Sequence, residues 1–243
     1  YLIWTIFCIL EIANPNHVQD AWNISITQYA IYPLVCAILV PISIKNKKHI
    51  HWLLVIWSIF VLFATFKGYL QKNHGFNERE LYFLYELGGA KTHLIWSGIR
   101  FFSVFTDAAN YGVHMAMAIV GFGISLIFTQ NKFLKFYYLI IISAATYSMF
   151  ISGTRAAIAV PMAGIFLFTL LAGNFRLFTF GAIIGITLFF FFNFSTIGDS
   201  NNNIRRMRSA FNPTKDASYQ VRKANQEQMK ILMSNKPFGY GIG

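Results

Sequence analysis

The chain has 243 residues, of which 56% are hydrophobic, 18% are aromatic and only 12% are charged. Because a soluble domain carries about 25% charged residues, this composition excludes an ordinary soluble fold. The apolar residues also stand in blocks with the charges between them, and contact with lipid explains this arrangement better than one large buried core does.

Seven apolar blocks follow one another along the chain. They cover residues 1–12, 28–44, 52–66, 111–128, 136–151, 156–171 and 177–194. A membrane span needs roughly 20 apolar residues, and barrel strands are shorter and alternate with polar residues. The first block is short and has no initiating Met or signal-peptide charges, so we interpret it as half of a truncated helix. The sequence therefore predicts an all-α polytopic transmembrane bundle of about seven spans.

The segments between the blocks alternate between two sides of the membrane. Side one holds short links at 45–51, 130–135 and 173–176, and side two holds 13–27, 67–110, 152–155 and 195–243. We therefore expect a transmembrane region over residues 1–194 that includes a long loop at 67–110. Residues 195–243 are expected to begin a large loop with an amphipathic helix.

The net charge of +11 does not settle the orientation of these sides. Side two carries fourteen of the twenty Lys and Arg residues, which places it in the cytoplasm by a plain count. The side-one cations, however, are dense and close to span ends, where the positive-inside rule acts. The charge fits anionic lipid headgroups or a bound polyanion. The cations show no nucleic-acid-binding motif, so no nucleic-acid partner is expected.

Arg155 is the most informative charged residue. It lies in the link Ser152-Gly153-Thr154-Arg155, about four residues long, between two apolar blocks. A charge at that depth is costly unless it pairs or faces a polar cavity. One interpretation is an anchor that extends toward the headgroups. The other is a guanidinium that faces a cavity, beside a tight turn whose backbone donors suit an anion.

Two further arginines and a polar pair lie on the same predicted side. Arg100 opens the segment that leads into the fourth block, where Asp107 and Asn110 are expected to cap the helix. Arg222 shares one face of a predicted helix with Asn225, Gln226, Met229 and Met233. Arg205, Arg206 and Arg208 form a cluster that favours a headgroup role over catalysis. No metal cluster and no cofactor motif is found in the sequence.

Three segments together resemble the O-antigen ligase and polymerase superfamily. Residues 100–111, Arg-Phe-Phe-Ser-Val-Phe-Thr-Asp-Ala-Ala-Asn-Tyr, are similar to its Arg-x-x-Gly-x-Phe-x-x-x-Asn segment. Residues 152–157, Ser-Gly-Thr-Arg-Ala-Ala, are similar to its Ser-x-x-Arg segment. Residues 222–243 resemble its arginine helix, which ends in Pro-x-Gly-x-Gly-x-Gly. Order and spacing agree from about residue 95 onward, whereas residues 1–94 match only in hydropathy.

Two departures accompany the resemblance. Ser103 stands where the family usually has Gly, at a position expected to form a tight turn. The family also has a catalytic His after the Gly-rich stretch, and none of the six histidines here maps onto it. We therefore expect that the chain ends at Gly243 before the catalytic His and the remaining spans of the family.

The resemblance implies a glycosyltransferase on the outer face of the bacterial inner membrane. Its donor would be a saccharide on undecaprenyl pyrophosphate. Its acceptor would be lipid A-core, another glycan of the cell envelope, or a protein hydroxyl. Arg155 and Arg222 would bind the pyrophosphate as catalytic residues, and Arg100, Asn110, Asp107 and Tyr219 would contribute to the substrate cavity. Side two would then be periplasmic, and its excess of cations would serve the donor.

Other functions remain open at this stage. The resemblance does not separate a ligase from a polymerase or a protein O-oligosaccharyltransferase. A polysaccharide or lipid transporter or flippase should show charges within its spans or an internal repeat of broken helices, and the sequence shows neither. A non-enzymatic scaffold would leave Arg155 without a polar partner.

Overall fold

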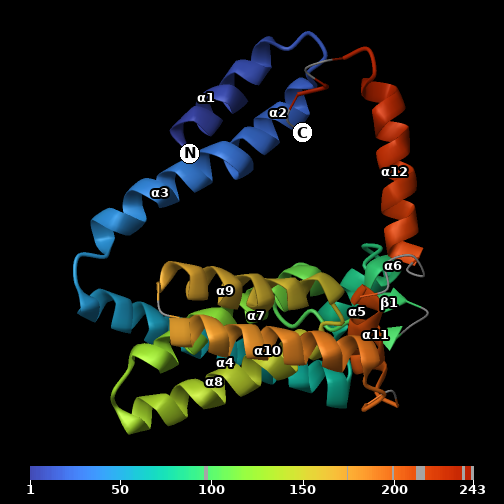
Figure 1. The fold of residues 1–243 in the computed structure, drawn as a ribbon. Coiled ribbons are helices and arrows are strands. Elements are labelled where there is room, and N and C mark those ends of the chain that lie inside the picture. The colour runs from blue at the N-terminus through green and yellow to red at the C-terminus, as the bar shows by residue number, and fades with distance from the viewer. Residues whose placement is uncertain (96–97, 174, 199, 212–216, 237–238, 242–243) are drawn as a thin grey trace. The chain divides into compact units, whose positions relative to one another are not determined.

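The structure is a computed structural model that describes residues 1–95, 98–173, 175–198, 200–211, 217–236 and 239–241. It divides into two compact units. The first comprises Tyr1–Leu53 and Ala217–Gly243, and the second comprises Leu54–Asp216. Figure 1 shows that the described part of each unit is built almost entirely of helices.

The first unit begins with a helical hairpin. Its elements are α1 (Leu2–Leu10), a 3₁₀ turn (Glu11–Ala13), α2 (Gln19–Ile26), a π-helical turn (Thr27–Ile31) and α3 (Tyr32–Ser43). Two indole hydrogen bonds link α1 to the elements that follow it. Trp22 Nε1 on α2 donates to the Cys8 carbonyl at 3.0 Å, and Trp4 Nε1 on α1 donates to the Tyr29 carbonyl of the π-helical turn at 2.9 Å. The unit also includes α12 (Ala217–Met233). The sequence predicted this helix.

Helix α4 (Lys47–His74) extends beyond the apolar block that predicted it. The block covered residues 52–66, whereas the helix has 28 residues, or about 42 Å of rise. The hydrocarbon core of a bilayer is about 30 Å thick, so the polar ends of α4 reach past it. Hydropathy detected only the apolar middle of the helix, because helical structure continues through the polar residues on both sides.

The second unit is centred on α7. Its other elements are α5 (Glu78–Tyr85), α6 (Ala90–His93), β1 (Leu94–Ile95), β2 (Gly98–Ile99), α7 (Ala108–Phe128), α8 (Lys132–Ile151), a 3₁₀ turn (Arg155–Ile158), α9 (Ala159–Leu171), α10 (Phe175–Phe194), α11 (Asn202–Arg208) and a second 3₁₀ turn (Ser209–Phe211). Helix α7 packs against α8 and α9, and α9 packs against α10 (Figure 1). The core includes fully buried Tyr111, Phe122 and Ile141.

The loop before α7 is folded onto the end of α4. Asn77 and Glu80 form a capping box that starts α5, and β1 and β2 form a short antiparallel pair with Leu94 opposite Ile99. The sequence did not predict this pair. The rings of Phe76 and Phe83 both pack against the ring of Phe102. The segment expected to be a long loop at 67–110 therefore begins within α4, and its described part also contains α5, α6 and the β1–β2 pair.

Four helical stretches are long and apolar enough to cross a membrane. They are Gln19–Ser43, Lys47–His74, Ala108–Phe128 and Lys132–Ile151. Three shorter apolar helices lie at Leu2–Ala13, Arg155–Leu171 and Gly181–Phe194. The chain is therefore a multi-pass membrane protein with four candidate spans. Each of the seven predicted blocks contributes residues to one of these seven helices.

The close approach of α7 to the link after α8 yields a stability prediction. A Cβ atom at Gly112 would overlap Ser152 Oγ and lie 2.8 Å from Thr154 Cβ, whereas one at Gly123 meets nothing within 4 Å. Gly112→Ala should therefore destabilise the protein by about 1–3 kcal/mol, because the turn is already packed. Gly123→Ala, on the same helix, should leave stability equal or higher. Thermal unfolding in detergent measures both, and equal melting temperatures for the two variants would contradict the close packing.

Candidate functional site

The link between α8 and α9 is a buried turn. Ser152, Gly153 and Thr154 are all buried, and the backbone of Gly153 has φ +60°, a conformation that L side chains disfavour. Ser152 Oγ donates to the Met149 carbonyl at 2.7 Å and accepts from the Thr154 amide at 3.2 Å. Thr154 Oγ1 donates to the Ala108 carbonyl at 2.7 Å. The turn is thus fixed to the end of α8 and to the start of α7.

Three arginines from distant parts of the chain meet around this turn. Arg100 Nη2 donates to Thr154 Oγ1 at 3.1 Å, and Arg206 Nε donates to the Gly153 carbonyl at 2.6 Å. Arg155 follows the turn directly, and its Nη1 donates to Ser209 Oγ at 3.0 Å. A Cβ atom on Gly153 would lie 3.3 Å from Arg206 Nε and 3.5 Å from Arg100 Cγ. Gly153 therefore leaves room for two arginine side chains.

The charges of this arginine cluster act on one another. Burial lowers the pKa of Arg100, Asp107 raises it, and the positive charge of Arg155 lowers it further. The group remains cationic, because the ordinary pKa of an arginine is far above neutrality. Nε of Arg100 is buried and has no hydrogen-bond partner in the structure. Neighbouring cations repel one another, and in a half-buried setting an accompanying anion relieves this repulsion. The cluster is therefore a candidate anion site.

Main-chain bonding to α4 positions the segment that carries Arg100. Ser103 has φ +54°, the conformation for which glycine is usually selected, and it occupies the position that is Gly in the resembled motif. The amide of Gln71 holds it there: Nε2 donates to the Ser103 carbonyl at 3.0 Å, and Oε1 accepts from the Ser103 amide at 2.8 Å. Ser103 Oγ donates to the Ala64 carbonyl at 2.7 Å. These bonds compensate for the strained backbone.

Glu80 completes this support. It accepts from Gln71 Nε2 at 3.0 Å and from Lys67 Nζ at 2.6 Å. Burial alone would raise the pKa of Glu80, but hydrogen bonds from Lys67, Asn77 and Gln71 outweigh it, and the pKa is lowered. The carboxylate therefore stays ionised and keeps the amide of Gln71 oriented toward Ser103.

His93 supports the site as a neutral group that contacts the start of α7. Its Nδ1 lies 2.8 Å from the Gly89 carbonyl, and its Nε2 accepts from the Ala108 amide at 3.3 Å. This pattern requires the tautomer with the proton on Nδ1. Burial lowers the pKa of His93, the bond to Gly89 opposes this, and the charge of Arg100 lowers it further. His93 therefore serves as a second cap for α7, and no sequence motif pointed to this role.

Of the predicted polar pair, Asp107 is the N-cap of α7, and Asn110 lies in the first turn of the helix. Asp107 Oδ1 accepts from the amides of Ala109 at 2.6 Å and Asn110 at 2.8 Å. Asn110 Nδ2 donates to Asp107 Oδ2 at 2.8 Å and to Thr106 Oγ1 at 3.1 Å. The carboxylate also acts on Arg100 electrostatically. Asp107 therefore helps to neutralise the cluster while it starts the helix.

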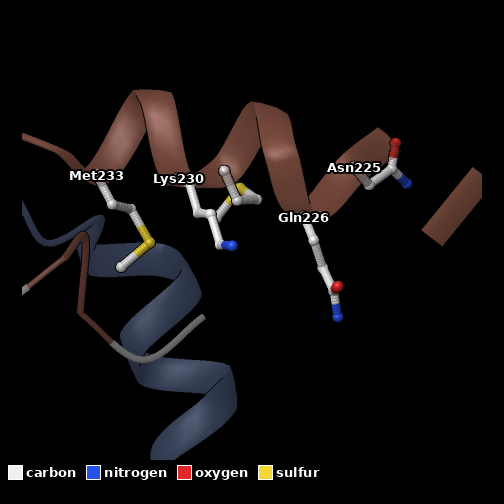
Figure 2. A pocket seen from close by; sticks show the side chains of 5 residues that line it. Asn225, Gln226, Lys230 and Met233 are labelled. Carbon is white, nitrogen blue, oxygen red and sulfur yellow. The ribbon is translucent and has the colours of Figure 1, made fainter. Parts of the chain in front are cut away.

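The remaining predicted site residues lie in the first unit. Arg222 and Tyr219 are both exposed on α12. The four residues predicted to share a face with Arg222 are Asn225, Gln226, Met229 and Met233, and all four line an open hollow together with Lys230. Figure 2 shows Gln226, Lys230 and Met233 projecting from the same side of the helix.

The glycine-rich stretch that follows α12 is described in part. Gly239 and Gly241 have φ values of +66° and +86°. Pro237, Phe238, Ile242 and Gly243, which belong to the same predicted motif, lie outside the described residues.

An apolar groove runs along α7, α9 and α10. A cavity of about 260 Å³ is lined almost wholly by apolar atoms, among them Gly123, Gly164 and Phe168. A second cavity of about 310 Å³ between α9 and α10 shares Ile165, Thr169 and Gly181 with the first. The groove has the chemistry expected of a site for a hydrocarbon chain.

Comparison with known protein families, with characterised proteins and with solved structures finds no match to this chain. Among the described residues, no group of three or more His, Cys, Asp or Glu side chains is arranged to hold a metal ion. The chemistry of the site is therefore argued from its own residues.

The lowered pKa of His93 predicts a pH-dependent stability. In the unfolded chain this histidine binds a proton below pH about 6.5, whereas in the folded chain it binds the proton only at a lower pH. Stability should therefore be fully present above pH about 6.5 and fall as the pH is lowered toward the folded pKa.

The melting temperature measured between pH 5 and 8 tests this predicted loss of stability, because the range includes the ordinary pKa of histidine at about 6.5. His93→Gln should lower the melting temperature at pH 8 and flatten its decline toward pH 5. The matched control is His74→Gln at an exposed position of α4, which should keep the wild-type pH profile. An unchanged profile in His93→Gln would refute the buried neutral role.

Proposed function

We propose that this protein is a membrane glycan transferase that moves a saccharide from undecaprenyl pyrophosphate to an acceptor hydroxyl, in the manner of O-antigen ligases and polymerases. The arginine cluster around the 152–155 turn carries the proposal. It combines Arg100, Arg155 and Arg206 at the end of a candidate span, where the pyrophosphate of a lipid-linked donor would lie. Guanidinium forks bind phosphate oxygens in bidentate fashion, and a buried setting strengthens the attraction.

The proposed reaction develops charge that the cluster can stabilise. The acceptor oxygen forms a bond to the anomeric carbon of the saccharide, and the bond from that carbon to the phosphate oxygen breaks with its electron pair on the pyrophosphate. Fixed cations lower the energy of that leaving group without reorganising. Within the second unit, Arg155 is proposed as its ligand. Arg100, Asp107 and Asn110 of the same unit are proposed to shape the substrate cavity.

The acceptor hydroxyl must also lose a proton to a base. His93 does not fit this role, because one of its nitrogens is bonded to the Gly89 carbonyl and the other to the Ala108 amide. His93 is therefore not proposed as the base.

The apolar groove supports the lipid part of the donor. A polyprenyl chain has no polar atoms, and the groove along α7, α9 and α10 offers almost none. Because the groove lies among apolar helices of the same unit as the arginines, one donor molecule has chemically matched surfaces for its tail and its pyrophosphate. This pairing of surfaces favours a lipid-linked anion over a soluble phosphate compound.

The proposal also assigns a sidedness. Seven spans, of which the first is partial, would place 67–110, the 152–155 turn and 195–243 on the periplasmic face of the bacterial inner membrane. The excess of cations on that face would then serve the donor, which explains why the positive-inside count is inconclusive.

The placement of charges in the spans favours a transferase over a transporter or flippase. Helix α7 contains no Asp, Glu, Lys or Arg, and in α8 the charged residues are Lys132 and Lys135 in its first turn. A pathway for a charged substrate through the membrane would need polar or ionisable groups in the middle of such helices. The arginines of the cluster instead lie outside these apolar helices: Arg100 in the loop before α7, Arg155 in the 3₁₀ turn after α8, and Arg206 in the short helix α11.

Replacement of Arg155 tests the proposal. Arg155→Ala should reduce glycan transfer by about 100-fold or more, because a fixed cation no longer stabilises the leaving pyrophosphate. Arg155→Lys should restore only part of the rate, because an ammonium lacks the bidentate fork. Transfer is measured in membranes of cells that carry only the variant protein.

The matched control is Arg79→Ala, which removes an exposed cation from α5 in the same unit and should leave transfer unchanged. Amounts of each protein in the membrane fraction show whether the variants fold. Wild-type transfer by a correctly inserted Arg155→Ala protein would exclude this mechanism.

A further inference from the structure

Helix α12 has two chemically different sides. At 100° per residue, Val221, Ala224, Ile231 and Leu232 fall within an arc of about 100°. Arg222, Lys223, Gln226 and Lys230 lie on the other side. Gln226 and Lys230 can be followed there in Figure 2, beside the open hollow. The helix is thus amphipathic, with Gln228 as a polar residue within the apolar arc.

The apolar side of α12 has no cover within the described part of its unit. Every described side chain from Tyr219 to Asn235 is exposed, and the exposed fractions of Val221, Ile231 and Leu232 are 60%, 74% and 56%. A helix of 17 residues is only marginally stable in water without tertiary packing. The apolar side therefore needs a partner that shields it from water.

The charge pattern indicates which partner fits. Arg222, Lys223 and Lys230 outnumber the one acidic residue of the helix, Glu227. Their long side chains can reach phosphate groups while the apolar side is buried, as in helices that lie in a membrane surface. Tyr219, with its apolar ring and polar hydroxyl, is of the residue type that concentrates at this depth. Because the same chain has four candidate spans, a bilayer is always close to the helix.

We infer that α12 lies in the surface of an anionic bilayer, with Val221, Ile231 and Leu232 among the acyl chains and its cations at the level of the lipid phosphates. Such a position gains hydrophobic free energy from the apolar side and electrostatic attraction from the cations. It also holds Arg222 at headgroup depth. The inference does not depend on the proposed glycan transfer, because it rests only on the two sides of the helix.

Depth-dependent quenching in proteoliposomes tests the inference. The protein carries Cys36→Ala, which removes the exposed native thiol, while Cys8 is buried. Single reporters are placed on the apolar side by Val221→Cys or Ile231→Cys and on the opposite side by Lys223→Cys or Lys230→Cys. Each is labelled with a polarity-sensitive fluorophore. Vesicles of phosphatidylcholine and phosphatidylglycerol contain lipids brominated along their acyl chains.

The expected result is quenching at least about twofold stronger on the apolar side than on the opposite side. Vesicles of phosphatidylcholine alone should reduce that difference, because the electrostatic attraction is lost. In detergent without brominated lipid, all reporters should remain unquenched.

Three outcomes would overturn the inference. Equal, weak quenching at all four positions would mean a helix in water. A polarity shift at Val221→Cys and Ile231→Cys without quenching by brominated lipid would mean that another part of the protein covers the apolar side. A polarity shift of the fluorophore that disappears when the protein is diluted among more vesicles would mean that a second copy of the protein covers the apolar side. Because all four positions are exposed, none of the reporters disturbs the packing of the described structure.

Discussion

The second unit depends on the buried turn at Ser152, Gly153 and Thr154. Thr154 Oγ1 links this turn to the start of α7 through the Ala108 carbonyl and to the preceding loop through Arg100. The Gly153 carbonyl accepts from Arg206, which ties in α11. A single short connection therefore fixes the positions of two spans, a folded loop and a cationic helix. The lack of a side chain at residue 153, where φ is +60°, relieves this crowding.

The same turn explains why positive charge can gather there. The three guanidinium groups are half-buried, each one bonds to main-chain or hydroxyl oxygens, and Asp107 offsets part of the charge on Arg100. Rigid support comes from neutral contacts, chiefly the Gln71 amide on Ser103 and the imidazole of His93 on α7. Because Asp107 offsets only part of the positive charge, the cluster keeps an attraction for an external anion, as the proposed transfer from a pyrophosphate-linked donor requires.

The sequence predicted the parts of this arrangement that depend on local order. Apolar blocks located the helices, Asp107 and Asn110 were identified as a cap, and the spacing within 217–233 predicted α12 and the face shared by Asn225, Gln226 and Met233. Long-range pairs were not predictable, because hydropathy carries no information about partners. The sequence therefore suggested a headgroup role for Arg206, whereas the structure places it on Gly153. For the same reason, the sequence did not predict the roles of Gln71 and His93. Gln71 accepts a hydrogen bond from Ser103, and His93 accepts one from Ala108, and both partners are distant in the sequence.

The central claim is that the arginine cluster binds the phosphates of a lipid-linked donor. Phosphorus-31 NMR of undecaprenyl pyrophosphate in detergent micelles, titrated with the protein, tests it most directly. The account predicts that both phosphorus resonances shift and broaden with the wild-type protein. It also predicts that these changes are largely lost in the double variant Arg100→Gln/Arg155→Gln, whereas undecaprenol without phosphate still competes for the apolar groove. Equal shifts with the wild-type and double-variant proteins would contradict the claim.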